Sequence, residues 1–207
     1  MPAQTTTIQT VTAVRPLKII SVVCLLLSIV LLIICLSTTY WLKTQYFHTG
    51  LFTECVNDDV GAKNNPMPNA PEPGKCQPAK RSPAYVTAVA ILLIVATVTT
   101  FCALVSNLLG LRSNDLHRKY ILYKAATYLS LFSVLCELVS LIVFPVCFFF
   151  TMHFYGLRNW EFDISYAVAW GAMLFSFGAS LLLICDKEHD EIYYKEKTIW
   201  NPPVEYT

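Results

Sequence analysis

Four long apolar runs divide this chain, and polar segments separate each run from the next. They extend from Ile19 to Tyr40, Ala84 to Leu111, Ala125 to Phe150 and Ile164 to Cys185, and Glu137 is the one acidic or basic residue inside them. An α-helix rises about 1.5 Å per residue, so about 20 apolar residues are enough to cross a hydrocarbon core of about 30 Å. The pattern therefore predicts an all-α membrane protein, a bundle of four transmembrane helices.

The polar segments between the runs predict the rest of the organisation. The residues from 19 to 185 form the four-span domain, flanked by an N-terminal tail (1–18) and a C-terminal tail (186–207), with loops at 41–83 and 151–163 on one side of the membrane. In the first loop, residues 43–56 are rich in aromatic and β-favouring residues and are interrupted by Gly50. Such a segment predicts a short antiparallel pair, or the start of a small sheet, on the membrane surface.

Composition agrees with a membrane protein and argues against several classes of function. Hydrophobic residues make up 55% of the chain and charged residues 14%, and the mean hydropathy is +0.51. The net charge of +1 gives no electrostatic reason to expect a nucleic-acid partner. No phosphate-binding glycine loop, nucleophile elbow or metal-binding histidine spacing is present in the sequence. We therefore expect no enzyme activity and no cofactor.

Charge and cysteine placement together predict the orientation of the chain. Nine basic residues fall on the side of the two tails and six on the side of the two loops, which places both termini in the cytoplasm. Cys55 and Cys76 are the two cysteines away from the helices, and both lie in the first loop. A disulfide between them needs an oxidising compartment, and the charge rule assigns the loops to that same side. The expected fold is thus a transmembrane bundle with a disulfide-stapled extracellular β segment.

One stripe of the third helix carries polar side chains at membrane depth. Ser130, Ser133, Glu137 and Ser140 are spaced by three, four and three residues, so they share one face, which we expect to point into the bundle. No Lys or Arg lies at that depth, so we expect a protonated carboxyl that is hydrogen-bonded to a neighbouring helix. The candidate partners are hydroxyl side chains near the middles of the other helices: Ser28, Thr97, Thr100 and Ser176. The stripe is interpreted as a polar clamp, with partner recognition and ion conduction as the alternatives.

Two further features bear on helix packing. The fourth run offers the small residues Ala167, Gly171 and Gly178 at helical spacings, which predicts either close packing within the bundle or a lateral seam for a partner or a second copy. Pro145 removes one backbone hydrogen bond from the third helix and predicts a kink near its outer end.

Three positions are candidates for modification. Cys185 ends the fourth run at the cytoplasmic interface, where cysteines are targets of reversible palmitoylation. Tyr193 and Tyr194 lie in a polar tail beside acidic residues, and phosphorylation there would add charge and hydrogen-bond acceptors.

The first loop resembles a known family. Its motif residues, in chain order, are Trp41, Gly50, Leu51, Phe52, Cys55 and Cys76. This series is similar to the W, G-L-W, C, C signature of the claudin and peripheral myelin protein superfamily, with Phe52 where claudins have Trp. Seven residues separate Cys76 from Ala84. This short segment and the tyrosine-bearing tail resemble the branch that contains transmembrane protein 47.

The resemblance carries expectations about function. It implies a protein of the plasma membrane at cell-cell junctions that contacts membrane lipid, the cadherin-catenin complex and the actin cortex, and that self-associates. An alternative is an auxiliary subunit that modulates an ion channel or receptor, since the superfamily includes calcium-channel gamma subunits. A third hypothesis is a small transporter or pore around Glu137.

Overall fold

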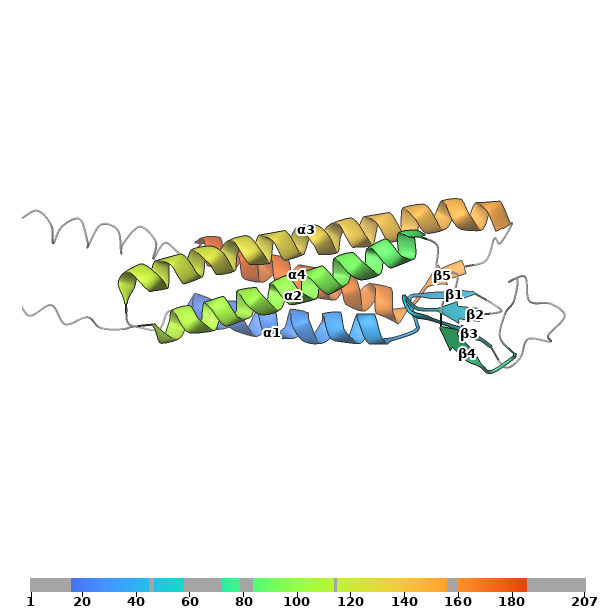
Figure 1. Ribbon diagram of the computed structural model, residues 1–207, viewed down its shortest axis with the longest axis horizontal. Coiled ribbons are helices and arrows are strands. Elements are labelled where there is room, and N and C mark those ends of the chain that lie inside the picture. The colour runs from blue at the N-terminus through green and yellow to red at the C-terminus, as the bar shows by residue number, and fades with distance from the viewer. Residues whose placement is uncertain are drawn as a thin grey trace, which may run out of the picture.

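Four helices lie side by side along the long axis of the molecule (Figure 1). The computed structural model describes residues 16–44, 47–57, 72–78, 84–113, 115–155 and 160–185. The helices are α1 (Pro16–Ser37), α2 (Ala84–Arg112), α3 (Leu116–Tyr155) and α4 (Ile164–Cys185), and all four are long and apolar enough to cross a membrane. The predicted four-helix transmembrane fold is confirmed.

The helix ends differ from the limits of the apolar runs. α1 ends at Ser37 rather than Tyr40, because the chain turns there to enter the sheet, and both the backbone N–H and the hydroxyl of Thr38 donate to the carbonyl of Ile34. α3 has 40 residues and extends past its apolar run at both ends. At about 1.5 Å per residue it is roughly 60 Å long, about twice the thickness of the hydrocarbon core. Hydropathy detects the part of a helix inside lipid, whereas hydrogen bonding continues into water.

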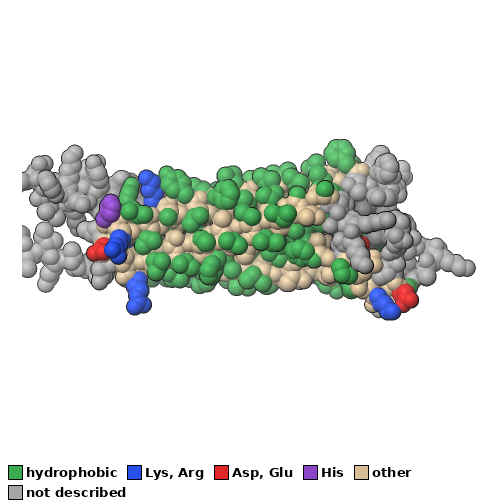
Figure 2. Space-filling model, in the orientation of Figure 1, with side chains coloured by type: hydrophobic (Ala, Val, Ile, Leu, Met, Phe, Trp, Pro, Cys, Tyr) green, Lys and Arg blue, Asp and Glu red, His purple; other side chains and the backbone are tan. Residues whose placement is uncertain are grey.

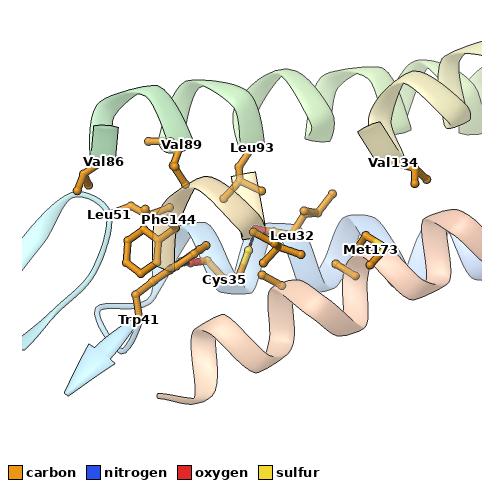
Figure 3. Close-up of a cluster of buried hydrophobic side chains, with 14 residues drawn as sticks. Leu32, Cys35, Trp41, Leu51, Val86, Val89, Leu93, Val134, Phe144 and Met173 are labelled. Atoms are coloured by element: carbon orange, nitrogen blue, oxygen red, sulfur yellow. Dashed lines mark hydrogen bonds between the residues drawn. The ribbon is translucent and has the colours of Figure 1, made fainter. Parts of the chain in front are cut away.

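The helices pack in a closed ring in which α1 contacts α2 and α4, and α3 contacts the same two helices. Many large apolar side chains on the outer surface are exposed, and they cover the middle of the bundle in Figure 2, with charged side chains gathered at its ends. Such a belt suits contact with lipid. The larger of two buried clusters lies at the end of the bundle next to the sheet, around Leu32, Trp41, Leu93 and Phe144 (Figure 3).

A five-stranded antiparallel sheet lies at one end of the bundle (Figure 1). Its strands are β1 (Leu42–Thr44), β2 (Phe47–Thr49), β3 (Thr53–Val56), β4 (Cys76–Pro78) and β5 (Trp160–Phe162), in the order β4-β3-β2-β1-β5. The expected small sheet in the first loop is therefore present. β5 comes from the second loop, which the sequence interpretation left without a strand.

Alternate residues of β1 show which side of the sheet is covered. Leu42 and Thr44 are buried while Lys43 between them is exposed. Because side chains alternate along a strand and directly paired residues share a face, Lys43 lies in one row with its partners His48 on β2 and Glu161 on β5. One face of β1 is therefore covered and the opposite face is open.

Candidate functional site: the sheet, its anchor and the buried polar network

Trp41 joins the sheet to the helices. Its side chain has no exposed surface, and its Nε1–H donates to the carbonyl of Cys35 at 2.6 Å. That carbonyl belongs to the last turn of α1, where a helix leaves carbonyls without intrahelical partners. The ring also makes an edge contact with Phe144 of α3, at 5.0 Å between centroids (Figure 3). A second edge contact is with Tyr166 of α4, at 6.1 Å. Trp41 thus contacts three helices and caps one of them.

Gly50 and Leu51 complete this joint, while Phe52 does not. A Cβ on Gly50 would lie 2.7 Å from Cα of Thr39 and 2.8 Å from the carbonyl oxygen of Thr38, so the close approach of the two backbones requires glycine. Leu51 is buried in the cluster around Trp41. Phe52 is 48% exposed. Gly50 and Leu51 are therefore part of the anchor, and Phe52 is available at the surface.

The disulfide between Cys55 and Cys76 joins β3 to β4, where the two residues are direct partners in the ladder. The chain returns to β4 through a tight turn: the N–H of Lys75 donates to the carbonyl of Glu72, and Gly74 has a φ of 78°. Closing a loop of this length stabilises the folded state by about 3 kcal/mol in the chain-entropy model. The predicted staple is confirmed.

The second loop fastens the sheet from its other edge. The N–H of Asp163 donates to the carbonyl of Trp41 at 3.2 Å, and the N–H of Ser165 donates to the carbonyl of Tyr40 at 3.0 Å. The carboxylate of Asp163 accepts the N–H of Ile164 at 2.7 Å, at the N-terminus of α4. The start of β1 and the start of α4 are therefore held together by backbone hydrogen bonds. An apolar-polar-apolar triplet at 160–162 was the signal for β5, but three residues are too few to identify a strand.

A second group of functional candidates lies at the middle of the bundle, around Glu137 of α3. Glu137 has no exposed surface, and its Oε1 accepts hydrogen bonds from the hydroxyls of Ser133 at 2.9 Å and Ser176 at 3.1 Å. Ser28 of α1 is hydrogen-bonded to Ser176 of α4 at 2.6 Å, and Thr100 of α2 is hydrogen-bonded to Ser133. All four helices contribute to this network, which we name the polar layer: Ser28, Thr100, Ser133, Glu137 and Ser176.

The rest of the predicted stripe is buried but takes no part in the polar layer. Ser140 donates to a carbonyl of its own helix, and Ser130 has no hydrogen-bond partner among the described residues. Thr97 also donates to a carbonyl of its own helix, so the expectation that it binds Glu137 is wrong. The stripe faces the bundle interior as the spacing predicted. A carboxyl with no exposed surface offers nothing directly to a partner in the membrane.

Pro145 lies inside α3, and a side chain from α4 takes over the hydrogen bond that it removes. A helix normally pairs the carbonyl of residue 141 with the N–H of residue 145, which proline lacks. The hydroxyl of Tyr166 donates to the carbonyl of Leu141 at 3.0 Å. The ring of Tyr166 stacks on Phe162 of β5 at 4.5 Å between centroids. α3 continues through Pro145 and is tied at Leu141 to α4 and, through Phe162, to the sheet, while the kink expected at Pro145 stays a prediction.

The sequence that forms these four spans and the stapled sheet matches a known family. The model of the PMP-22/EMP/MP20/Claudin family matches residues 16–183. The chain belongs to this family. The match begins at the first residue of α1, ends within α4, and includes the sheet between them. Members of the PMP-22/EMP/MP20/Claudin family are four-span, junction-type and generally non-enzymatic structural membrane proteins. In this chain Trp41, Gly50 and Leu51 form the anchor described above, and Cys55 and Cys76 form the staple.

One packing expectation is corrected on this family fold. Ala167 of α4 is exposed, and no atom of another described element lies within 4 Å of where a Cβ on Gly178 would be, so packing within the bundle is wrong for these two residues. A Cβ on Gly171 would lie 3.7 Å from the side chain of Leu31, in ordinary contact with α1. The small α4 residues that pack inside are on a neighbouring face: Ala169, Ala172, Ser176 and Ala179. A lateral seam at Ala167 and Gly178 stays a prediction.

The predicted modification sites fall at or beyond the end of the family match. Cys185 is exposed at the end of α4, as a palmitoylated cysteine would need to be. Tyr193 and Tyr194 lie outside the described residues. Modification of all three stays a prediction.

Proposed function

We propose that this chain is a non-enzymatic membrane protein of cell-cell junctions that organises adhesion complexes and links them to cortical actin. The observation that carries the proposal is the sheet, which the buried Trp41 and the Cys55–Cys76 disulfide hold firmly on one end of the bundle. A pre-ordered surface loses little conformational entropy when it binds, so it suits a protein that acts through contacts. Family membership supports the junction-type class.

Two features support an orientation with the sheet outside the cell and both termini in the cytoplasm. The disulfide needs an oxidising compartment, so the end with the sheet faces the exterior. The opposite end carries Arg112, Arg118, Lys119 and Lys124 on α2 and α3, and basic residues gather on the cytoplasmic side. The proposed location is the plasma membrane at cell borders.

Within the family, we place the chain nearest the branch that contains transmembrane protein 47. Only seven residues lie between Cys76 and Ala84, and the first two of them belong to β4, which is Cys76–Pro78. This short return to α2 and the resemblance in the first loop support that placement. The branch in turn suggests the partners, which are the cadherin-catenin complex and the actin cortex.

Proximity labelling from the C-terminus of the tagged full chain in epithelial cells tests this function. The expected result is enrichment of catenins and cortical actin-binding proteins, with the chain concentrated at cell borders. Phe52→Ser removes an exposed side chain from the connection between β2 and β3 and should lower border enrichment without lowering total surface level. Labelling of catenins no higher than with an unrelated four-span protein would refute the proposal.

A second candidate is an auxiliary subunit of an ion channel or receptor, and the open face of α4 favours it. Small residues without neighbours let another helix approach closely, which is how helices associate in lipid. Under this candidate, Gly178→Leu should abolish copurification with a pore-forming subunit and its effect on gating. Retained copurification with the leucine variant would exclude this seam.

A further inference from the structure

The end of the bundle opposite the sheet carries a basic patch. We define the basic patch as Arg112, the last residue of α2, and Arg118, Lys119 and Lys124 of α3. Arg112, Arg118 and Lys124 are exposed and Lys119 is half-buried. The described residues of this end include one acidic side chain, Asp115, whose Oδ2 lies 3.5 Å from Nε of Arg118. Positive charge therefore dominates this end of the described bundle, and Figure 2 shows blue side chains gathered there.

Contacts next to the basic patch show that it lies at the edge of the apolar belt. The ammonium of Lys18 stands 3.9 Å from the ring centroid of Tyr123, and a Cβ on Gly110 would lie 2.9 Å from the same ring. These contacts bring α1, α2 and α3 together at one level. Arg112 and Lys124 lie two residues and one residue from this level along their helices, about 3 Å of rise or less. Tyrosine and lysine at such a level are typical of the boundary between hydrocarbon and headgroups.

The start of α3 carries more basic than acidic side chains. His117, Arg118 and Lys119 occupy its first turn, which contains no acidic residue. A helix N-terminus already carries about half a positive charge, and basic side chains add to it instead of neutralising it. α2 ends at Arg112 and α3 begins at Leu116, so the basic residues of the two helix ends are close in sequence. Asp115, immediately before the helix, offsets part of this charge, and an anion at this end would add to that stabilisation.

We propose that the basic patch binds the headgroups of anionic phospholipids in the surrounding leaflet. Phosphate oxygens accept charge-assisted hydrogen bonds from arginine and lysine, and four basic residues beside membrane spans match the density that attracts acidic lipids. The patch lies at headgroup level, so lipid reaches it without leaving the membrane. This binding is independent of the junctional function proposed above and would hold for either orientation of the chain.

The test compares lipid preference of the full chain in vesicles of phosphatidylcholine with and without phosphatidylserine. Energy transfer from the protein is measured to a fluorescent phosphatidylserine and, separately, to a fluorescent phosphatidylcholine. The ratio of the two signals reports how strongly phosphatidylserine is enriched around the protein. Each basic residue removed should lower the preference about fivefold, so Arg112→Gln, Lys119→Gln and Lys124→Gln together should lower it about a hundredfold. Raising the salt concentration should lower the wild-type preference in the same direction.

Two control variants separate lipid binding from loss of fold. Exchanging the three residues for the other basic type, with Arg112→Lys, Lys119→Arg and Lys124→Arg, should preserve the preference. Lys43→Gln with Lys75→Gln removes two charges at the sheet end and should not change it. Equal preference in wild type and the triple glutamine variant would overturn the proposal, as would an equal loss in the sheet-end control. Displacement of the lipid by the same concentration of inorganic phosphate would show a general anion site and would also overturn it.

Discussion

Removing the hydroxyl of Tyr166 should destabilise the bundle because it leaves a carbonyl of α3 without a partner. The carbonyl is that of Leu141, which is fully buried, and Pro145 cannot supply the usual N–H. Tyr166→Phe keeps the ring stacked on Phe162 and removes only the 3.0 Å hydrogen bond. Interhelical hydrogen bonds in membranes are worth about 0.6 kcal/mol on average and about 1.7 kcal/mol at most. We expect a loss of about 1 kcal/mol, or about fivefold in the folding equilibrium.

A double-mutant cycle with Pro145→Ala isolates this effect. Alanine restores the N–H at position 145, so the carbonyl of Leu141 regains a partner within its own helix and no longer needs Tyr166. The cost of Tyr166→Phe should fall to near zero in the Pro145→Ala background, whatever Pro145→Ala does alone. The assay is reversible unfolding of the purified protein in mixed micelles, followed by circular dichroism. Equal costs of Tyr166→Phe in the two backgrounds would refute the inference that the Tyr166 hydroxyl replaces the N–H that Pro145 lacks.

Three further predictions follow from the anchor, the polar layer and the sheet. Glu137→Gln should fold like wild type, since an amide has the same donor and acceptor as a protonated carboxyl, whereas Glu137→Leu removes the acceptor of two hydroxyls and should cost about 1 to 2 kcal/mol; equal surface levels of wild type and the leucine variant would contradict the clamp. Gly50→Ala should cost about 1 to 3 kcal/mol through backbone overlap, with Gly178→Ala as the matched control that costs nothing; thermal unfolding of both decides this. Burial raises the pKa of Glu54 above its ordinary value of 4.5, so the folded sheet is favoured below that pH and loses this contribution as pH rises through the raised pKa. Glu54→Gln should therefore slow hydrogen exchange of the β3 amides at pH 7 and leave it unchanged at pH 4, by an amount equivalent to about 0.5 kcal/mol or less; a gain at both pH values would show another cause.

The spacing of polar residues predicted the interior of α3 well. A carboxyl and three hydroxyls at three- and four-residue intervals define one helix face, and polar side chains in lipid turn inward. Of the candidate partners for Glu137, Ser176 binds it directly, whereas Ser28 and Thr100 join the polar layer through Ser176 and Ser133. The same reasoning could not exclude Thr97, because a threonine in a helix can donate to its own backbone and so needs no partner helix.

Small residues were a poorer guide to the buried face of α4. Lipid tails are as apolar as the bundle interior, so hydropathy does not distinguish a face that meets lipid from a face that meets another helix. Ala167 and Gly178 were expected either inside the bundle or at a lateral seam, and they do not pack inside. Ser176 and Ser180, both buried, mark the true inner face, so hydroxyls at helical spacing were the better signal. β5 escaped the sequence interpretation for a different reason, since its three residues are extended through pairing with β1.

The inner face of α1 shows how a bundle without a hydrophobic driving force between its helices fixes one register. Ser21, Ser28 and Cys35 are seven residues apart, and each makes a specific polar contact: Ser21 accepts from Asn107 of α2, Ser28 bonds Ser176 of α4, and the carbonyl of Cys35 accepts from Trp41. A seven-residue interval keeps one face towards the neighbouring helices over two turns. Moving α1 by one residue would break all three contacts together, at about 0.6 kcal/mol or more for each. The contact with Trp41 belongs to the sheet, so the register of α1 in the membrane and the position of the sheet above it are set by the same helix.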